Sequence, residues 1–172
     1  MEIRCDMHTV NDIFVDYLDG KFCMREYKGK RLFDLEDKRT LVGWMINGLP
    51  LPSITILKKT DDTQHGTFEV IQGVQRIATI VSFMLGDFAV VREGAEYYFD
   101  LKCNSTTLSL LQNKDERLKF HEGACFLSVD ECTAFSEYKL SVEIEESNSK
   151  TINLLEMYNM MDCMGLFDIW CT

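Results

Sequence analysis

Apolar residues recur at three- and four-residue intervals in two stretches near the start of the chain, and this spacing predicts two amphipathic helices. The first covers residues 9–20, with Thr9 suited to the N-cap and Gly20 to the end. The second covers residues 34–47 and begins with an acidic relative of the capping box. The predicted inner faces consist of Val10, Ile13, Phe14, Tyr17 and Leu18 in the first helix, and of Leu41, Val42, Met45 and Ile46 in the second.

Runs of β-branched and aromatic residues predict strands in the middle of the chain. Residues 53–57 and 68–71 flank a polar stretch, which predicts an antiparallel hairpin. Residues 88–92 and 96–101 flank Glu93-Gly94-Ala95, which predicts a second hairpin.

The last third of the chain has a weaker pattern. Residues 126–129 and 140–144 are strand candidates, residues 145–149 predict a loop, and residues 104–120 are expected to be partly helical. Methionine and tyrosine at helical spacing predict a final helix over residues 150–163. Because no internal repeat or linker interrupts these elements, we expect one α+β domain.

The stretch from Thr67 to Asp87 joins a strand directly to an apolar helix. Gly73 allows a tight turn between them, and a helix presents free N–H groups and a positive dipole end at its start. Arg76 adds a planar fork of donors in the first helical turn. These features predict an anion site, most simply for phosphate.

A simpler interpretation of the same stretch is that Gly73 only turns the chain and that Arg76 is a solvated surface charge. On spacing alone this interpretation is favoured, because short glycine motifs match by chance often.

Composition limits the classes of partner. The chain has 172 residues, of which 46% are hydrophobic and 11% aromatic, so it can bury a core. It carries 28 acidic and 18 basic residues, a formal charge of −10, without a basic block. This balance argues against direct, high-affinity nucleic-acid binding and allows a basic protein partner.

Cysteine and histidine usage indicates neither a disulfide framework nor a zinc site. The seven cysteines are odd in number and form no C-x-x-C pair, so we expect most of them to be buried small hydrophobes in a reducing compartment. The three histidines stand far apart. With no signal peptide or membrane span in the pattern, we expect an intracellular, cytoplasmic protein, or one of a host cell or virion if the chain is viral.

Three segments resemble the N-terminal domain of GmrSD-type, modification-dependent restriction endonucleases, within the ParB/sulfiredoxin-like superfamily. Residues 41–52, LVGWMINGLPLP, are similar to the family's L-I-x-S-I-L-x-G-x-P-I-P. Residues 69–80, EVIQGVQRIATI, are similar to E-V-V-D-G-Q-Q-R-L-T-T-L. Residues 155–165 are similar, more weakly, to F-x-R-I-N-x-G-G. The resemblance spans about Thr9 to Phe167 and implies a small mixed sheet flanked by helices over residues 1–172, without a nuclease domain.

The resemblance implies a nucleotide-phosphate site in which Gln72, Gly73, Gln75 and Arg76 line the turn. In the family the D-G-Q-Q-R motif serves NTP binding and hydrolysis, usually with a divalent cation, so NTP with Mg²⁺ is the implied ligand. Matches at Gly73, Gln75 and Arg76 reverse the preference for the simpler interpretation of the turn.

Departures from the family pattern argue against hydrolysis. Gln72 replaces the family's Asp, and a neutral amide holds a divalent cation far less well than a carboxylate does. Val74 replaces a Gln, and the family's Y-Q-R segment aligns with Tyr27-Lys28-Gly29, so Lys28, Lys30 or Arg31 would substitute only as point charges. Strand alternation places Glu69 on the face opposite Gln72, where it would not replace the missing acid.

The sequence therefore predicts a degenerate, non-catalytic domain with no catalytic or metal-ligating residue. It would act as an interaction, regulatory or structural module with a protein partner, retain nucleotide or phosphate binding, and bind no membrane. The alternative is an NTP-binding and hydrolysing domain of a DNA restriction or anti-phage defence system. A third hypothesis is an acidic mimic of DNA.

Overall fold

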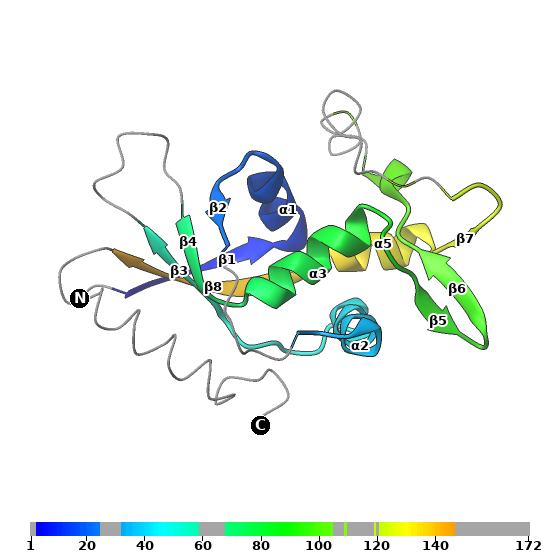
Figure 1. Cartoon of the computed structure of the whole chain (residues 1–172), viewed down its shortest axis with the longest axis horizontal. Coiled ribbons are helices and arrows are strands. Elements are labelled where there is room, and N and C mark those ends of the chain that lie inside the picture. Colours follow the sequence, from blue (N-terminus) through cyan, green and yellow to red (C-terminus); the bar gives the residue numbers. More distant parts are fainter. Residues whose placement is uncertain are drawn as a thin grey trace. The chain divides into compact units, whose positions relative to one another are not determined.

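The computed structural model of the chain describes residues 3–24, 32–58, 68–104, 109, 119 and 121–146 (Figure 1). It confirms the α+β class. The chain divides into two compact units. The sheet unit takes the described residues of 1–32, 51–75 and 139–172, and the helical unit takes those of 33–50 and 76–138. The predicted single-domain organisation stays a prediction.

The sheet unit is built on five strands in the order β1-β8-β3-β4-β2 (Figure 1). The β1–β8 and β3–β4 pairs are antiparallel, whereas β8–β3 and β4–β2 are parallel. The pairing of β3 with β4 confirms the first predicted hairpin. The strands are β1 (Ile3–Thr9), β2 (Phe22–Cys23), β3 (Ile54–Lys58), β4 (Phe68–Gln72) and β8 (Lys139–Glu146).

The first predicted helix forms as α1 (Val10–Leu18), directly after β1. Thr9 accepts from the Asp12 N–H while the Asp12 carboxylate accepts from the Thr9 N–H, which satisfies two N–H groups at the helix start. Val10, Ile13 and Phe14 are buried as predicted, whereas Tyr17 and Leu18 are half-buried.

Both faces of the central strands are buried, as is common where a sheet is covered on two sides. The register places one apolar set on a common face, made of Ile54, Ile56, Val70 and Val142. On the opposite face the buried positions that pair in register are Thr55, Leu57, Glu69 and Glu145. The second set is mostly polar, which is unusual for the interior of a sheet.

The helical unit contains three helices and a small sheet among its described residues. They are α2 (Leu35–Ile46), α3 (Val74–Met84) from Arg76 on, β5 (Val90–Arg92), β6 (Ala95–Tyr98), β7 (Cys125–Phe126), α5 (Val129–Ser136) and the 3₁₀ turn η1 (Leu101–Cys103). Glu93 and Gly94 both have positive φ, of 49° and 78°, so they form the two-residue turn that suits a hairpin. The second predicted hairpin is therefore confirmed, with shorter strands.

Aromatic side chains form the core of the helical unit. Phe83 is fully buried, and its ring centroid lies 5.1 Å from that of Phe135 and 5.3 Å from that of Phe88. Phe99 completes the cluster at 5.9 Å from Phe83. Tilted and edge-on aromatic pairs of this kind add about 0.5–1.5 kcal/mol each beyond the burial of apolar area.

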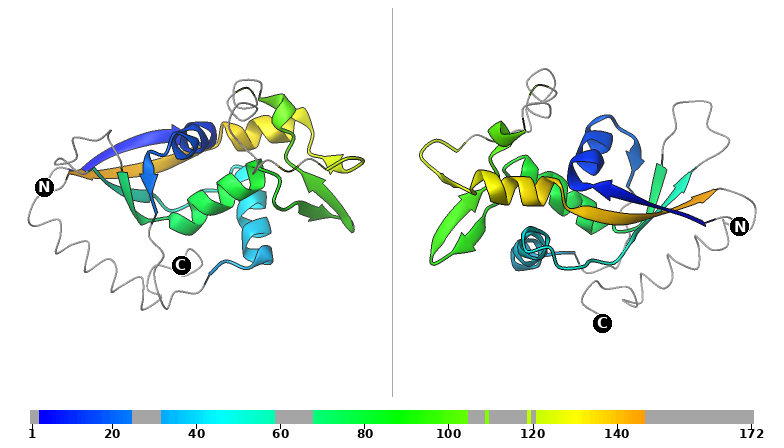
Figure 2. Two further views of the ribbon diagram at one scale, coloured as in Figure 1. Left: turned by 45° about the horizontal axis from the view of Figure 1, so that its top comes forward. Right: turned by 180° about the vertical axis from the view of Figure 1, so that it is seen from behind.

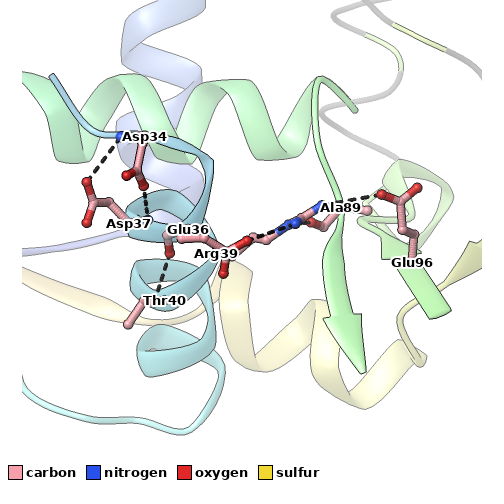
Figure 3. Close-up of polar contacts among 7 residues, drawn as sticks. All are labelled: Asp34, Glu36, Asp37, Arg39, Thr40, Ala89 and Glu96. Atoms are coloured by element: carbon pink, nitrogen blue, oxygen red, sulfur yellow. Dashed lines mark hydrogen bonds and ion pairs between the residues drawn. The ribbon is translucent and has the colours of Figure 1, made fainter. Parts of the chain in front are cut away.

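Arg39 joins α2 to the β5–β6 hairpin within the helical unit (Figure 3). Its Nε donates to the Ala89 carbonyl at 2.9 Å, and its two terminal nitrogens donate to Glu36 and Glu96. The capping box of Asp34 and Asp37 precedes it at the start of the helix, as predicted. The Arg39 side chain is only 19% exposed, so its planar fork holds three acceptors in a partly dry environment.

Two elements differ from the sequence prediction. Residues 3–9 form β1, for which no strand was predicted, and residues 129–136 form α5 where a strand was predicted to reach Val129. Ser128 and Glu131 form a capping box at the start of α5, so the helix begins just where the apolar run 126–129 suggested extension. Glu145 and Glu146, predicted to lie in a loop, extend β8.

The cysteine prediction was wrong for the described residues. Cys132 is buried, but the other described cysteines, at positions 5, 23, 103 and 125, are exposed. Cys5 and Cys23 lie on the two edge strands of the large sheet, where neighbouring strands cover only one side of the backbone.

Candidate functional site

The predicted turn between strand and helix is present. β4 ends at Gln72, α3 begins at Val74, and Gly73 between them has a φ of 99°. The backbone of a residue with a Cβ is strained at this angle, so the position requires glycine. The N-terminal amides of α3 therefore follow the turn at once, as the anion-site prediction requires.

Gln72 lies on a different face from the one that strand alternation predicted. The register between β3 and β4 shifts at Thr55 and Ile56, so that Leu57 faces Glu69 while Thr55 faces Gln72. Thr55 and Leu57 are two residues apart and share a face, and directly paired residues share a face as well. Glu69 and Gln72 therefore lie on the same face, because a β-bulge adds one residue to β4.

The Gln72 side chain is held in the sheet. Its amide oxygen accepts from the hydroxyl of buried Thr55 at 3.5 Å, a long hydrogen bond. Gln72 itself is half-buried. The side chain at this position is therefore a neutral amide that brings no charge.

Arg76 is a buried cation. The residue is only 2% exposed, so the interpretation of Arg76 as a solvated surface charge was wrong. Burial lowers the pKa of Arg76 to about 10, and the neighbouring Tyr138 raises it. The guanidinium therefore stays protonated at neutral pH, although it sits in the first turn of α3, where the helix dipole favours negative charge.

The four predicted site residues lie within one five-residue segment, and the boundary between the two units falls inside it. Gln72, Gly73 and Gln75 belong to the sheet unit and Arg76 to the helical unit. Gln72 contacts Thr55, and Arg76 lies beside Tyr138, each within its own unit. Gln75 is half-buried in the first turn of the helix.

Sequence reasoning missed a row of carboxylates on the Gln72 face of the sheet. Glu69 and Glu145 both pair with Leu57, one from each neighbouring strand, and Glu143 pairs with Thr55. Glu145 is 2% exposed, and its Oε1 has no hydrogen-bond partner among the residues that the structure describes. Burial, followed by the charge of Glu143, raises the pKa of Glu145. The alternation of acidic residues in 143-EIE-145 was the available signal, but it was assigned in part to a loop.

No three or more His, Cys, Asp or Glu side chains are grouped to hold a metal ion in the part of the chain that the structure describes. The predicted substitutes for the second arginine, Lys28, Lys30 and Arg31, lie outside the described residues. The same holds for Tyr27-Lys28-Gly29, for residues 155–165 of the third resembling segment and for the predicted last helix.

Comparisons with known proteins place the chain in no family: no family model matches it, and neither a curated protein nor a solved structure does. In the described residues, no helix has both the length and the apolar character needed to cross a membrane.

Proposed function

We propose that this chain is a non-catalytic relative of the GmrSD-type N-terminal domain, acting as an interaction, regulatory or structural module. Its Gly73–Arg76 turn retains binding of nucleotide or phosphate. The observation that carries this proposal is the combination of a left-handed glycine with a buried, protonated arginine in the first helical turn.

Physical chemistry connects this combination to an anion. Amides at a helix N-terminus donate to a bound phosphate, and the positive end of the helix dipole favours negative charge there. A protonated arginine in the same helical turn adds positive charge close to that position. We therefore expect the turn to prefer an anion to a neutral ligand.

The non-catalytic part of the proposal is supported by Gln72. Where the resembled motif carries its acid, this chain has an amide whose oxygen accepts from Thr55. An amide cannot act as a general base near neutral pH and gives a divalent cation no charge. Binding without turnover is the function that fits these side chains.

Equilibrium unfolding in the presence of anions tests the proposal. Orthophosphate, pyrophosphate, ATP and GTP, each with and without Mg²⁺, are expected to raise the unfolding midpoint in proportion to the logarithm of anion concentration once it exceeds Kd. Arg76→Gln is expected to abolish the increase. Arg92→Gln is the matched control, since Arg92 lies in the same unit with a side chain 43% exposed, and its loss is expected to leave the increase intact.

Two outcomes would contradict anion binding: no anion raises the midpoint, or the increase survives Arg76→Gln. Should Arg76→Gln fail to fold, Gln75→Ala in the same helical turn replaces it, with a reduced increase expected. Release of orthophosphate from ATP or GTP by the wild-type chain would instead support the hydrolysing alternative.

A further inference from the structure

The first strand of the sheet unit has one free edge among the described residues. Among the described strands, β1 lies at the end of the order and pairs with β8 alone (Figure 2). It is seven residues long and contains neither proline nor a bulge in its register with β8. Such an edge presents a row of N–H and C=O groups to any further strand, and natural proteins usually protect it.

The side chains of β1 add apolar surface to this edge. Ile3 and Met7 are 50% and 61% exposed, and both lie on the face that also carries exposed Cys5. The opposite face carries Arg4 and Asp6, whose side chains form an ion pair at 2.9 Å. Charged residues on the edge would normally oppose association, so their arrangement decides what can pair with it.

The sequence of β1 is self-complementary about Cys5. Reading outward from Cys5, the neighbours are Arg4 and Asp6, and then Ile3 and Met7. In an antiparallel pair of two copies centred on Cys5, each Arg4 faces the Asp6 of the other copy, and each Ile3 faces a Met7. Opposite charges and apolar residues placed directly across from each other stabilise an antiparallel pair.

The adjacent registers are disfavoured by the same charges. In a dimer whose two-fold axis is normal to the sheet, each side chain stays on its own face. Directly paired residues share a face, so the axis lies between two copies of the same residue. Moving the axis by one residue therefore shifts the pairing by two residues. Centring the pair on Arg4 brings two arginines together, and centring it on Asp6 brings two aspartates together. Like charges directly opposite each other destabilise the pair.

We propose that β1 is a homodimerisation edge, on which a second copy of this chain pairs antiparallel about Cys5 and extends the sheet across both copies. The partner is a second copy because the edge is complementary in charge to itself. The proposal does not depend on the anion site of Gly73–Arg76.

Charge exchange tests the pairing. Sedimentation velocity and light scattering over a range of protein concentration are expected to show a reversible dimer for the wild-type chain. Arg4→Asp and Asp6→Arg each replace two attractive pairs by two repulsive ones, and each is expected to raise the dimer Kd by about tenfold or more. The double variant, Arg4→Asp with Asp6→Arg, restores two attractive pairs and is expected to recover the dimer.

Mixing the two single variants provides a control for misfolding, because misfolded variants would not regain association when mixed. An equimolar mixture of the two single variants is expected to form a heterodimer, because opposite charges face each other again only between unlike chains. A short bismaleimide is expected to link two copies through Cys5 in the wild-type chain, and not after Cys5→Ser or Arg4→Asp.

A wild-type chain that stays monomeric at every concentration would overturn the proposal. So would single variants that dimerise as tightly as the wild-type chain, since the dimer would then use another surface. Recovery in the double variant and in the mixture would support the register, whereas loss in both would refute it.

Discussion

Gly73→Ala perturbs the turn on which the candidate site depends. At a φ of 99°, a side chain beyond hydrogen strains the backbone, and residues held in sparsely populated regions cost about 1–3 kcal/mol. Replacing glycine also lowers the conformational entropy of the unfolded chain, which stabilises the folded state by roughly 0.4–1 kcal/mol. The net expectation is a loss of about 1–2 kcal/mol in the free energy of unfolding.

Two other glycines provide matched controls. Gly20 lies in the sheet unit with a φ of 72°, and an added Cβ meets no atom within 4 Å, so Gly20→Ala tests backbone strain away from the site. Gly43 lies inside α2 without positive φ and with equally open space. Gly43→Ala is expected to stabilise the protein by about 0.5–1 kcal/mol, since alanine is the better helix former.

Urea unfolding followed by circular dichroism measures the free energy of unfolding of all three variants. In thermal unfolding, a loss of 1 kcal/mol corresponds to a fall in Tm of about 2–4 °C for a chain of this size. Gly73→Ala is also expected to weaken the stabilisation by phosphate, whereas Gly20→Ala is expected to lose stability and keep that response. A Gly73→Ala protein as stable as the wild-type chain would refute the strained-turn argument.

Three further changes test other parts of the structure. Burial and the charge of Glu143 raise the pKa of Glu145 in the folded protein. The contribution of this group to the free energy of unfolding is therefore fully present below its unfolded pKa and is lost as pH rises through the raised folded pKa. Glu145→Gln is therefore expected to stabilise the protein above that window and flatten the dependence of the urea midpoint on pH; an unchanged pH profile would contradict this. Ser128→Ala removes the side chain that accepts from the Glu131 N–H and is expected to cost about 1 kcal/mol in urea unfolding, with no loss counting against the cap. Iodoacetamide with mass-spectrometric mapping is expected to spare Cys132, because burial raises its pKa to about 12, and to label the exposed cysteines 5, 23, 103 and 125; rapid labelling of Cys132 in the folded protein would be the contrary result.

Local signals in the sequence were sufficient at two helix starts and at the turn after β4. The helices after Thr9 and Asp34 begin at the predicted residues because each N-cap and the acid three residues later satisfy each other's backbone N–H. Gly73 was identified as a turn because the pattern changes there from strand to helix. In these places one short segment contains all the interactions that decide the outcome.

Prediction failed where distant strands decide the outcome. β1 pairs with β8, more than a hundred residues later, and seven alternating residues alone gave too weak a signal. Burial of Arg76 was likewise invisible, since a single arginine in a helix is most often solvated. By contrast, α5 could have been predicted, because Ser128 and Glu131 have the spacing of a capping box.

The bulge in β4 changes which side chains surround the amide at position 72. With strict alternation, Gln72 would face away from Glu69, and an acid at this position would stand alone. The register instead places Gln72 on the face that carries Glu69, Glu143 and Glu145. Burial and like charge already raise the pKa of Glu145 on this face, so another carboxylate there would add repulsion and a further desolvation cost. A neutral side chain that accepts from Thr55 avoids both costs, so the amide fits its place in this sheet.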